Sequence, residues 1–145
     1  TNYELIASEN DRVFDYENRI YRPFMTDQLL LKQLMTILFD NAIKYTEEDG
    51  EIEFVVYATD RHLYLTVTDN GIGISAADKK KIFDRFYRVD KARTRQKGGF
   101  GLGLSLAKQI VDALRGTITV KDNKPRGTIF EVKIAIQSPS KRKNK

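Results

Sequence analysis

Two amphipathic stretches, each followed by a pair of β-rich runs, constrain the fold of this chain most strongly. In "QLLLKQLMTILFDNAIKYT" (28–46), apolar residues recur at helical spacing, namely Leu30, Leu34, Ile37, Leu38 and Ala42. Asp27 stands directly before this run and is the predicted N-cap. The runs "IEFVVYA" and "LYLTVTD" are rich in β-branched and aromatic residues, and "TDRH" joins them. We therefore expect a helix over 28–46 and a strand pair after it.

The second amphipathic stretch predicts the same order of elements. "LGLSLAKQIVDALRG" (102–116) reads as a helix that Gly116 ends, and "TITVK" and "TIFEVKIAI" read as strands around the turn "DNKPRG". A first strand within "DRVFDYENRIYRPF" and a short helix over 76–88, begun by a capping box of Ser75 and Asp78, complete the order. This order is not a regular βαβ alternation. It predicts an α/β (α+β) two-layer sandwich, with a mixed, mostly antiparallel sheet covered by helices on one face.

Composition narrows the class of protein. With 145 residues the chain fits one domain, and the absence of cysteine excludes disulfides and thiolate metal sites. No apolar run approaches the roughly 18 residues that a membrane span needs, and "TNYELIASENDR" shows no leader. We expect a soluble domain, and the lack of cysteine is compatible with a reducing compartment.

The basic balance belongs to the end of the chain. The net charge is +5, from 25 basic and 20 acidic residues. Four of the basic residues stand among the last five positions: Lys141, Arg142, Lys143 and Lys145. We predict a disordered basic tail over 138–145 and a nearly neutral body with no specific nucleic-acid partner. Contact of the tail with nucleic acid or lipid is the alternative.

The first candidate site lies at the end of the first predicted helix. Asn41, Lys44 and Tyr45 are three and four residues apart, so they share one helix face. An asparagine oxygen suits Mg²⁺, a lysine supplies a point charge for phosphate, and a tyrosine ring can contact a base. Taken alone, a solvated polar helix end explains these residues equally well.

The second candidate is "VTDNGIGIS". Asp69 closes a predicted strand, and Gly71 and Gly73 follow it. A carboxylate at this position can accept a hydrogen bond from an exocyclic amine, and glycines allow the backbone to approach a flat ring closely. Asp-Asn-Gly by itself favours a plain turn.

The third candidate is glycine-rich. Gly98, Gly99, Gly101 and Gly103 precede the second long helix, where unpaired N–H groups can converge on an anion. A dinucleotide fingerprint fails because Leu106 occupies its third glycine position, and neither a Walker A pattern nor a protein-kinase motif set is present. A plain loop, a hinge and a phosphate cradle remain open.

Taken in order, these stretches resemble the ATP-binding catalytic domain of bacterial sensor histidine kinases. "DNAIKYT" is similar to the N box of that family, "DNGIGI" to its G1 box, "IFDRFYRVD" to its F box and "GGFGLGLSLAKQIV" to its G2 box. The match covers roughly residues 11–136, and four boxes in this order are specific. The resemblance implies the Bergerat ATP-binding fold, which gyrase, Hsp90 and MutL ATPases share.

The resemblance also implies a role for each matching residue. Asp69 receives the adenine amino group, Asn41 ligates Mg²⁺, and Thr128 supports the adenine pocket. Residues from about 87 to 100 form a mobile lid, and the glycines give N–H groups to the phosphates. The implied ATP-binding residues are Asn41, Lys44, Tyr45, Asp69, Gly71, Gly73, Phe86, Arg88, Gly99, Phe100, Gly101, Leu102, Gly103, Leu104 and Thr128.

A histidine kinase also needs a phosphoacceptor histidine. The one histidine here, His62, stands between two predicted strands without a helical context, so we expect a surface residue of the hairpin. The resemblance therefore implies that residues 1–10 are the remnant of a linker from a separate dimerisation and phosphoacceptor domain, and that 11–137 form the catalytic domain. The expected chain is a monomer that binds ATP and Mg²⁺ but is inactive alone. It would be the cytoplasmic part of a membrane-anchored sensor that signals to a response regulator.

One position departs from the hydrolytic relatives. Those relatives place a water-activating glutamate four residues before the metal asparagine, and here that residue is Ile37, which cannot take a proton. Asp40 lies about 100° around the helix and is a poor substitute. This favours γ-phosphoryl transfer to a histidine over an ATP-hydrolysing conformational module. A non-catalytic nucleotide-binding or interaction module is the third alternative.

Overall fold

The computed structural model describes residues 7, 12–20, 24–84 and 103–137. Its elements, in chain order, are β1 (Val13–Arg19), α2 (Gln28–Tyr45), β2 (Glu51–Ala58), β3 (His62–Asp69), α3 (Ala76–Lys79), α5 (Gly103–Ala113), β4 (Thr117–Asp122) and β5 (Thr128–Ala135). This order confirms the predicted succession of a strand, a helix, two strands, a short helix, a long helix and two strands.

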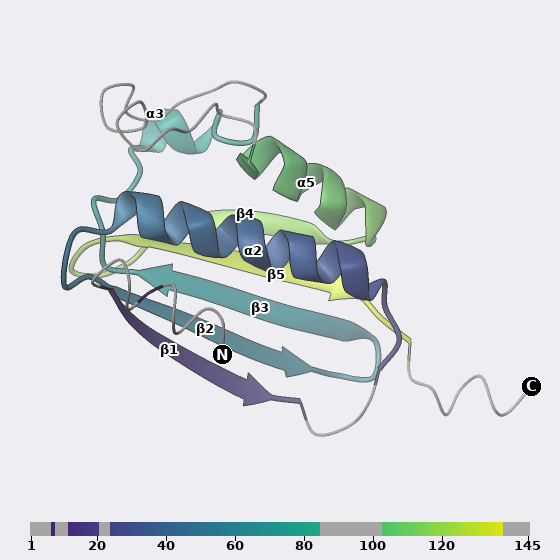
Figure 1. Cartoon of the computed structure of the whole chain (residues 1–145). Helices are drawn as coiled ribbons and strands as arrows, with labels where there is room; N and C mark the ends of the chain where they lie inside the picture. Colours follow the sequence, from purple (N-terminus) through teal and green to yellow (C-terminus); the bar gives the residue numbers. More distant parts are fainter. Residues whose placement is uncertain (1–6, 8–11, 21–23, 85–102, 138–145) are drawn as a thin grey trace, which may run out of the picture.

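The strands form one sheet in the order β1-β2-β3-β5-β4. β1 pairs with β2 in parallel, and the other three pairings are antiparallel. Helices α2 and α5 pack together on one face of this sheet (Figure 1). The prediction of a two-layer sandwich with a mixed, mostly antiparallel sheet is confirmed.

The core lies between the sheet and these helices. Alternate residues of the central strands are buried there: Ile52, Phe54, Val56, Leu63, Leu65, Val67, Phe130, Val132 and Ile134. Phe14 and Phe39 meet edge to face at a ring distance of 5.3 Å, and both pack against Phe54. Each fully buried aliphatic or aromatic side chain stabilises the fold by about 1.5–3 kcal/mol. The packed core therefore fixes the positions of the strand ends, where Asp69 and Thr128 lie.

Helix α2 begins as predicted. The carboxylate of Asp27 accepts a hydrogen bond of 3.0 Å from the backbone N–H of Leu30, which is an N-cap. Within the predicted stripe, three residues are buried (Leu34, Leu38, Ala42) and two are half-buried (Leu30, Ile37). No helix of the described residues is long and apolar enough to cross a membrane.

The helix predicted over 76–88 is wrong in length. Ser75 caps the N–H of Asp78 at 3.1 Å as expected, but α3 ends at Lys79. The chain then continues in turns. The N–H of Lys81 donates to the carbonyl oxygen of Asp78, and the N–H of Asp84 donates to that of Lys81. These turns place Ile82 in the core and leave Phe83 half-buried against it, with its ring 6.4 Å from that of Phe130.

The end of α5 also differs from the prediction. The left-handed residue is Arg115, with φ of 59°, and not Gly116. Gly116 is needed for another reason, because a Cβ at this position would lie 2.1 Å from the carbonyl oxygen of Lys133 on β5. The glycine permits close contact with the sheet rather than a left-handed turn.

Candidate functional site

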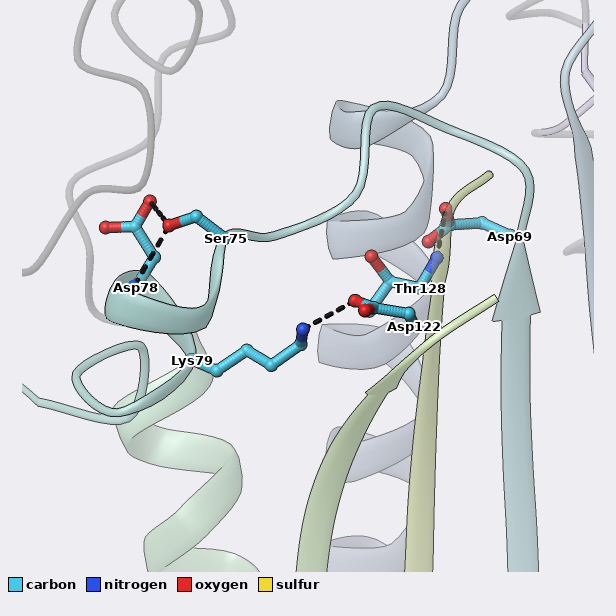
Figure 2. A network of polar contacts seen from close by, with 6 residues as sticks. All are labelled: Asp69, Ser75, Asp78, Lys79, Asp122 and Thr128. Atoms are coloured by element: carbon cyan, nitrogen blue, oxygen red, sulfur yellow. Dashed lines mark hydrogen bonds and ion pairs between the residues drawn. The ribbon is translucent and has the colours of Figure 1, made fainter. Parts of the chain in front are cut away.

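Asp69 and Thr128 meet at one end of the sheet. Asp69 is the last residue of β3 and continues its buried alternation, and it is directly opposite Thr128, the first residue of β5 (Figure 2). The two side chains are 2% exposed each. A carboxylate and a hydroxyl therefore lie side by side in the helix-facing layer, where the other strand positions hold apolar residues.

The Asp69 carboxylate is held by only one of its oxygens. Oδ1 accepts hydrogen bonds from the N–H of Gly71 at 2.9 Å and of Thr128 at 3.3 Å. Burial raises the pKa of Asp69 above its usual value, and these two N–H groups oppose that rise. Within the described residues, Oδ2 accepts no hydrogen bond. Oδ2 is thus an acceptor that a ligand donor can satisfy.

The Thr128 hydroxyl has no hydrogen-bond partner in the part of the chain that the structure describes. Among the described residues, its Oγ1 is the one buried side-chain polar atom without a hydrogen bond. Such an orphaned group costs about 1–3 kcal/mol, so native structures retain few of them. Together with Oδ2 of Asp69, it supplies a donor and acceptor pair for a polar ligand.

The loop after β3 lies against the end of α2. Ile72 donates its N–H to the carbonyl oxygen of Tyr45 at 3.0 Å, and a Cβ on Gly71 would lie 1.9 Å from that oxygen. Only glycine permits this approach. The contact brings the predicted N-box helix end and the predicted G1 loop together.

The three predicted N-box side chains occupy the last turns of α2. Asn41 and Lys44 are half-buried, and Tyr45 is buried. Asp40, beside Asn41, has its pKa raised by partial burial, which the charge of Lys44 opposes. The structure leaves Asn41 and Lys44 accessible to a ligand at this helix end, whereas Tyr45 also belongs to the core.

The turn between β4 and β5 also contacts the loop that follows β3. The sequence patterns did not predict this contact. Asn123 donates from Nδ2 to the carbonyl oxygen of Asp69 at 2.9 Å, and Arg126 donates from Nε to that of Gly71 at 2.8 Å. Gly127 has φ of 115°, and a Cβ there would lie 1.9 Å from the Asp69 carbonyl oxygen. In the sequence, "DNKPRG" carries only a turn signal, so nothing local reveals that it clamps the loop.

An open groove of about 590 Å³ adjoins this clamp. It is lined by residues 72–75 and 122–127, and therefore includes the predicted site residue Gly73. An ion pair of 2.5 Å between Lys79 and Asp122 joins α3 to the end of β4 beside it (Figure 2). The groove does not include Asn41, Lys44, Asp69 or Thr128.

The start of α5 approaches α2 one turn before Asn41. A Cβ on Gly103 would meet Cγ2 of Ile37 at 3.6 Å, an ordinary contact distance, and Leu104 is buried. Ile37 therefore packs between the helices, which gives this apolar residue a structural role. The remaining predicted site residues, and the predicted lid, lie outside the described residues: Phe86, Arg88, Gly99, Phe100, Gly101 and Leu102.

His62 is the first residue of β3 rather than part of the turn before it. Its ring is half-buried and lies 6.2 Å from that of Tyr64. Over the described ranges, no group of three or more histidine and carboxylate side chains could hold a metal ion. A divalent cation at this site would need ligands from a bound molecule as well as from Asn41.

Comparison with known proteins gives the family. Residues 26–138 match the model of the histidine kinase-, DNA gyrase B- and HSP90-like ATPases. Over 143 residues the chain is 84% identical to the sensor protein CiaH of Streptococcus pneumoniae serotype 4, covering 99% of this chain and 32% of that protein. It is 45% identical over 104 residues to the sensor histidine kinase WalK of Bacillus subtilis, covering 70% of this chain and 17% of WalK.

Solved structures agree with this assignment. The mycobacterial sensor histidine kinase MprB superposes with a TM-score of 0.75 at 26% identity, over 94% of this chain and 90% of that one. The catalytic domain of the histidine kinase ThkA gives 0.76 at 25% identity, over 97% and 89%. The chain spans about a third of the length of CiaH. It belongs to the histidine kinase-, DNA gyrase B- and HSP90-like ATPase family, as a catalytic ATP-binding domain of the sensor histidine kinase type.

Proposed function

We propose that this domain binds Mg²⁺-ATP and presents the γ-phosphoryl group to a histidine on a separate domain of the same protein. The observation that carries the proposal is the buried pair of Asp69 and Thr128, in which one carboxylate oxygen and one hydroxyl lack partners among the described residues. Adenine carries an amine donor next to ring-nitrogen acceptors, which complements this pair. The residues present therefore fit the base of ATP.

The other side chains fit the rest of the nucleotide. Asn41 would offer its amide oxygen to Mg²⁺, and Lys44 its charge to a phosphate. Bound Mg²⁺ neutralises charge on the phosphates. Gly103 and Leu104 begin α5, where backbone N–H groups can meet an anion.

Phosphoryl transfer is favoured over hydrolysis because of Ile37. This residue occupies the position from which a carboxylate would activate water, and it instead packs against α5. An acceptor imidazole brings its own lone pair and needs no such base. CiaH and WalK are longer than this chain, which leaves room for a phosphoacceptor domain in the whole protein. We propose residues 1–10 as the connection to that domain and 11–137 as the catalytic domain. We further propose membrane anchoring of the whole protein and a response regulator as the final acceptor.

Two measurements test the proposal. Calorimetry should detect ATP binding to the 145-residue chain that weakens when EDTA removes Mg²⁺. With radiolabelled ATP, label should appear on a supplied phosphoacceptor fragment and never on this chain alone, and His62→Gln should behave as wild type. Absence of ATP binding would refute the nucleotide site. Stable labelling of His62 would refute transfer to a separate domain.

A further inference from the structure

The first described residues are fastened to the domain at two points. Ala7 is 1% exposed and belongs to the core cluster, and its carbonyl oxygen accepts the N–H of Arg12 at 2.8 Å. Val13 then donates its N–H to the carbonyl oxygen of Gly50 at 2.8 Å, where β1 begins. The segment that leads into β1, here called the entry segment (residues 7 and 12), is thus packed against the domain rather than trailing from it.

Arg12 joins this segment to the C-terminal end of α2. Its Nε donates to Oγ1 of Thr46 at 2.9 Å, and its Nη2 donates to the carbonyl oxygens of Ile43 (3.2 Å) and Thr46. Thr46 is fully buried and closes the helix, with its N–H and its hydroxyl both bonded to the carbonyl oxygen of Ala42. A guanidinium at this position satisfies carbonyls that the helix leaves unpaired and complements the partial negative charge of its end.

The same helix end belongs to the nucleotide site. Ile43 lies between Asn41 and Lys44, and Tyr45 holds the loop after β3 through the N–H of Ile72. That loop in turn supplies the N–H of Gly71 to Asp69. A continuous set of hydrogen bonds and covalent links thus runs from Arg12, through the last turn of α2, to the Asp69 carboxylate.

We propose that Arg12 is a positioning residue that couples the entry segment to the nucleotide site, so that displacement of this segment loosens the last turn of α2 and lowers the affinity for ATP. The inference rests on the proposed function, because ATP is the ligand whose affinity would change. It provides a physical route by which whatever precedes residue 7 in a longer protein affects the site. The hydrogen bonds described for the Arg12 side chain go to Ile43 and Thr46, so we infer that it acts on the site through α2.

The test compares Arg12→Ala, Arg12→Lys and the control Arg61→Ala in the 145-residue chain. Arg61 is exposed, at the opposite end of β3 from Asp69. Calorimetry should give about tenfold weaker ATP binding for Arg12→Ala, no change for the control, and an intermediate value for Arg12→Lys, which keeps the charge but loses the fork of donors. Hydrogen exchange without nucleotide should show faster exchange at the amides of Thr46 and Ile72 in Arg12→Ala, and unchanged exchange at Val67.

The exchange arm separates this inference from the proposed function. If the wild-type chain fails to bind ATP, the proposed function is refuted, and unprotected Thr46 and Ile72 amides in Arg12→Ala still support the coupling. If Arg12→Ala had the same ATP affinity and the same amide exchange as Arg61→Ala, the proposed coupling would be overturned. Should Arg12→Ala not fold, Thr46→Val removes the acceptor of Nε, and wild-type behaviour of both Thr46→Val and Arg12→Lys would overturn the inference equally.

Discussion

Replacing Asp69 by asparagine should abolish most of the affinity for ATP. In the wild type, Oδ1 is committed to the N–H groups of Gly71 and Thr128, and Oδ2 is the acceptor proposed for the adenine amine. An asparagine has one acceptor oxygen. If that oxygen keeps the two backbone donors, its NH₂ faces the amine of the base, and if it turns towards the base, its NH₂ faces the two N–H groups. Either orientation opposes donor to donor.

The magnitude follows from the bonds that are lost. A hydrogen bond to a charged group contributes about 1.5–3 kcal/mol. Since about 1.4 kcal/mol corresponds to a factor of ten, this loss alone weakens binding about 10- to 150-fold. The opposed donors add to it, so we expect a loss near the upper end. The orientation that turns NH₂ towards the base suits a carbonyl oxygen instead, and the preference for ATP over GTP should therefore fall as well.

Calorimetry with ATP and with GTP, each with Mg²⁺, measures both effects. Asp15→Asn is the matched control, because Asp15 is exposed on β1 and the same charge is removed there without touching the site. Circular dichroism should show that both variants are folded. An Asp69→Asn variant that bound ATP within about threefold of wild type would refute the assignment of this carboxylate to the base.

Three further predictions concern neighbouring residues and stability. Thr128→Val removes the orphaned hydroxyl, so the free chain should be as stable as wild type or more stable by about 1 kcal/mol in urea, while ATP binds about 3- to 10-fold more weakly; lower stability would contradict this. Gly71→Ala should lower the melting temperature sharply, because its Cβ would lie 1.9 Å from the Tyr45 carbonyl oxygen, whereas Gly103→Ala, with its nearest neighbour at 3.6 Å, should not lower it. Burial raises the folded pKa of Asp69 above its unfolded value of about 3.8, so its contribution to stability is lost as pH rises through the folded pKa. Asp69→Asn should thus gain melting temperature relative to wild type as the pH rises above the unfolded value of 3.8, and a difference in melting temperature that does not change with pH would argue against a raised pKa.

Sequence patterns were sufficient for the elements that bury a regular face. The spacing of Leu34, Leu38 and Ala42 predicts α2, and the density of β-branched residues predicts β2 and β3, since these patterns follow from helical and strand periods. The length of α3 was not predictable in this way. The three successive lysines and the apolar residues after them suit a helix, and no local pattern indicates that the α-helix ends at Lys79.

Long-range contacts account for what residue periodicity alone could not predict at the site, where the resemblance to sensor kinases was needed to place Asp69 and Thr128 in one pocket. The alternation in "LYLTVTD" implies that Asp69 faces the same side as Val67, but its pairing with Thr128 depends on the register of β3 with β5, across 59 residues. Arg126 and Asn123 donate to backbone carbonyl oxygens. Every residue carries such a carbonyl, so the amino-acid sequence does not indicate which one is bound. Arg12 is a similar case, because an arginine before a strand carries no signal of the helix end that it caps.

The buried carboxylate of Asp69 and the unpaired hydroxyl of Thr128 also explain why several residues outside the sheet contact this end of it. A buried carboxylate with a raised pKa and an unpaired hydroxyl both disfavour the folded state without ligand. The large apolar core can offset this cost in free energy, but it cannot hold the two groups in place. Position is supplied by Arg126 and Asn123 on one side and by the end of α2, capped by Arg12, on the other. The clamps therefore preorganise donors and acceptors for a ligand. Weakening a clamp should reduce affinity more than stability, and removing the unpaired Thr128 hydroxyl should reduce affinity without any loss of stability.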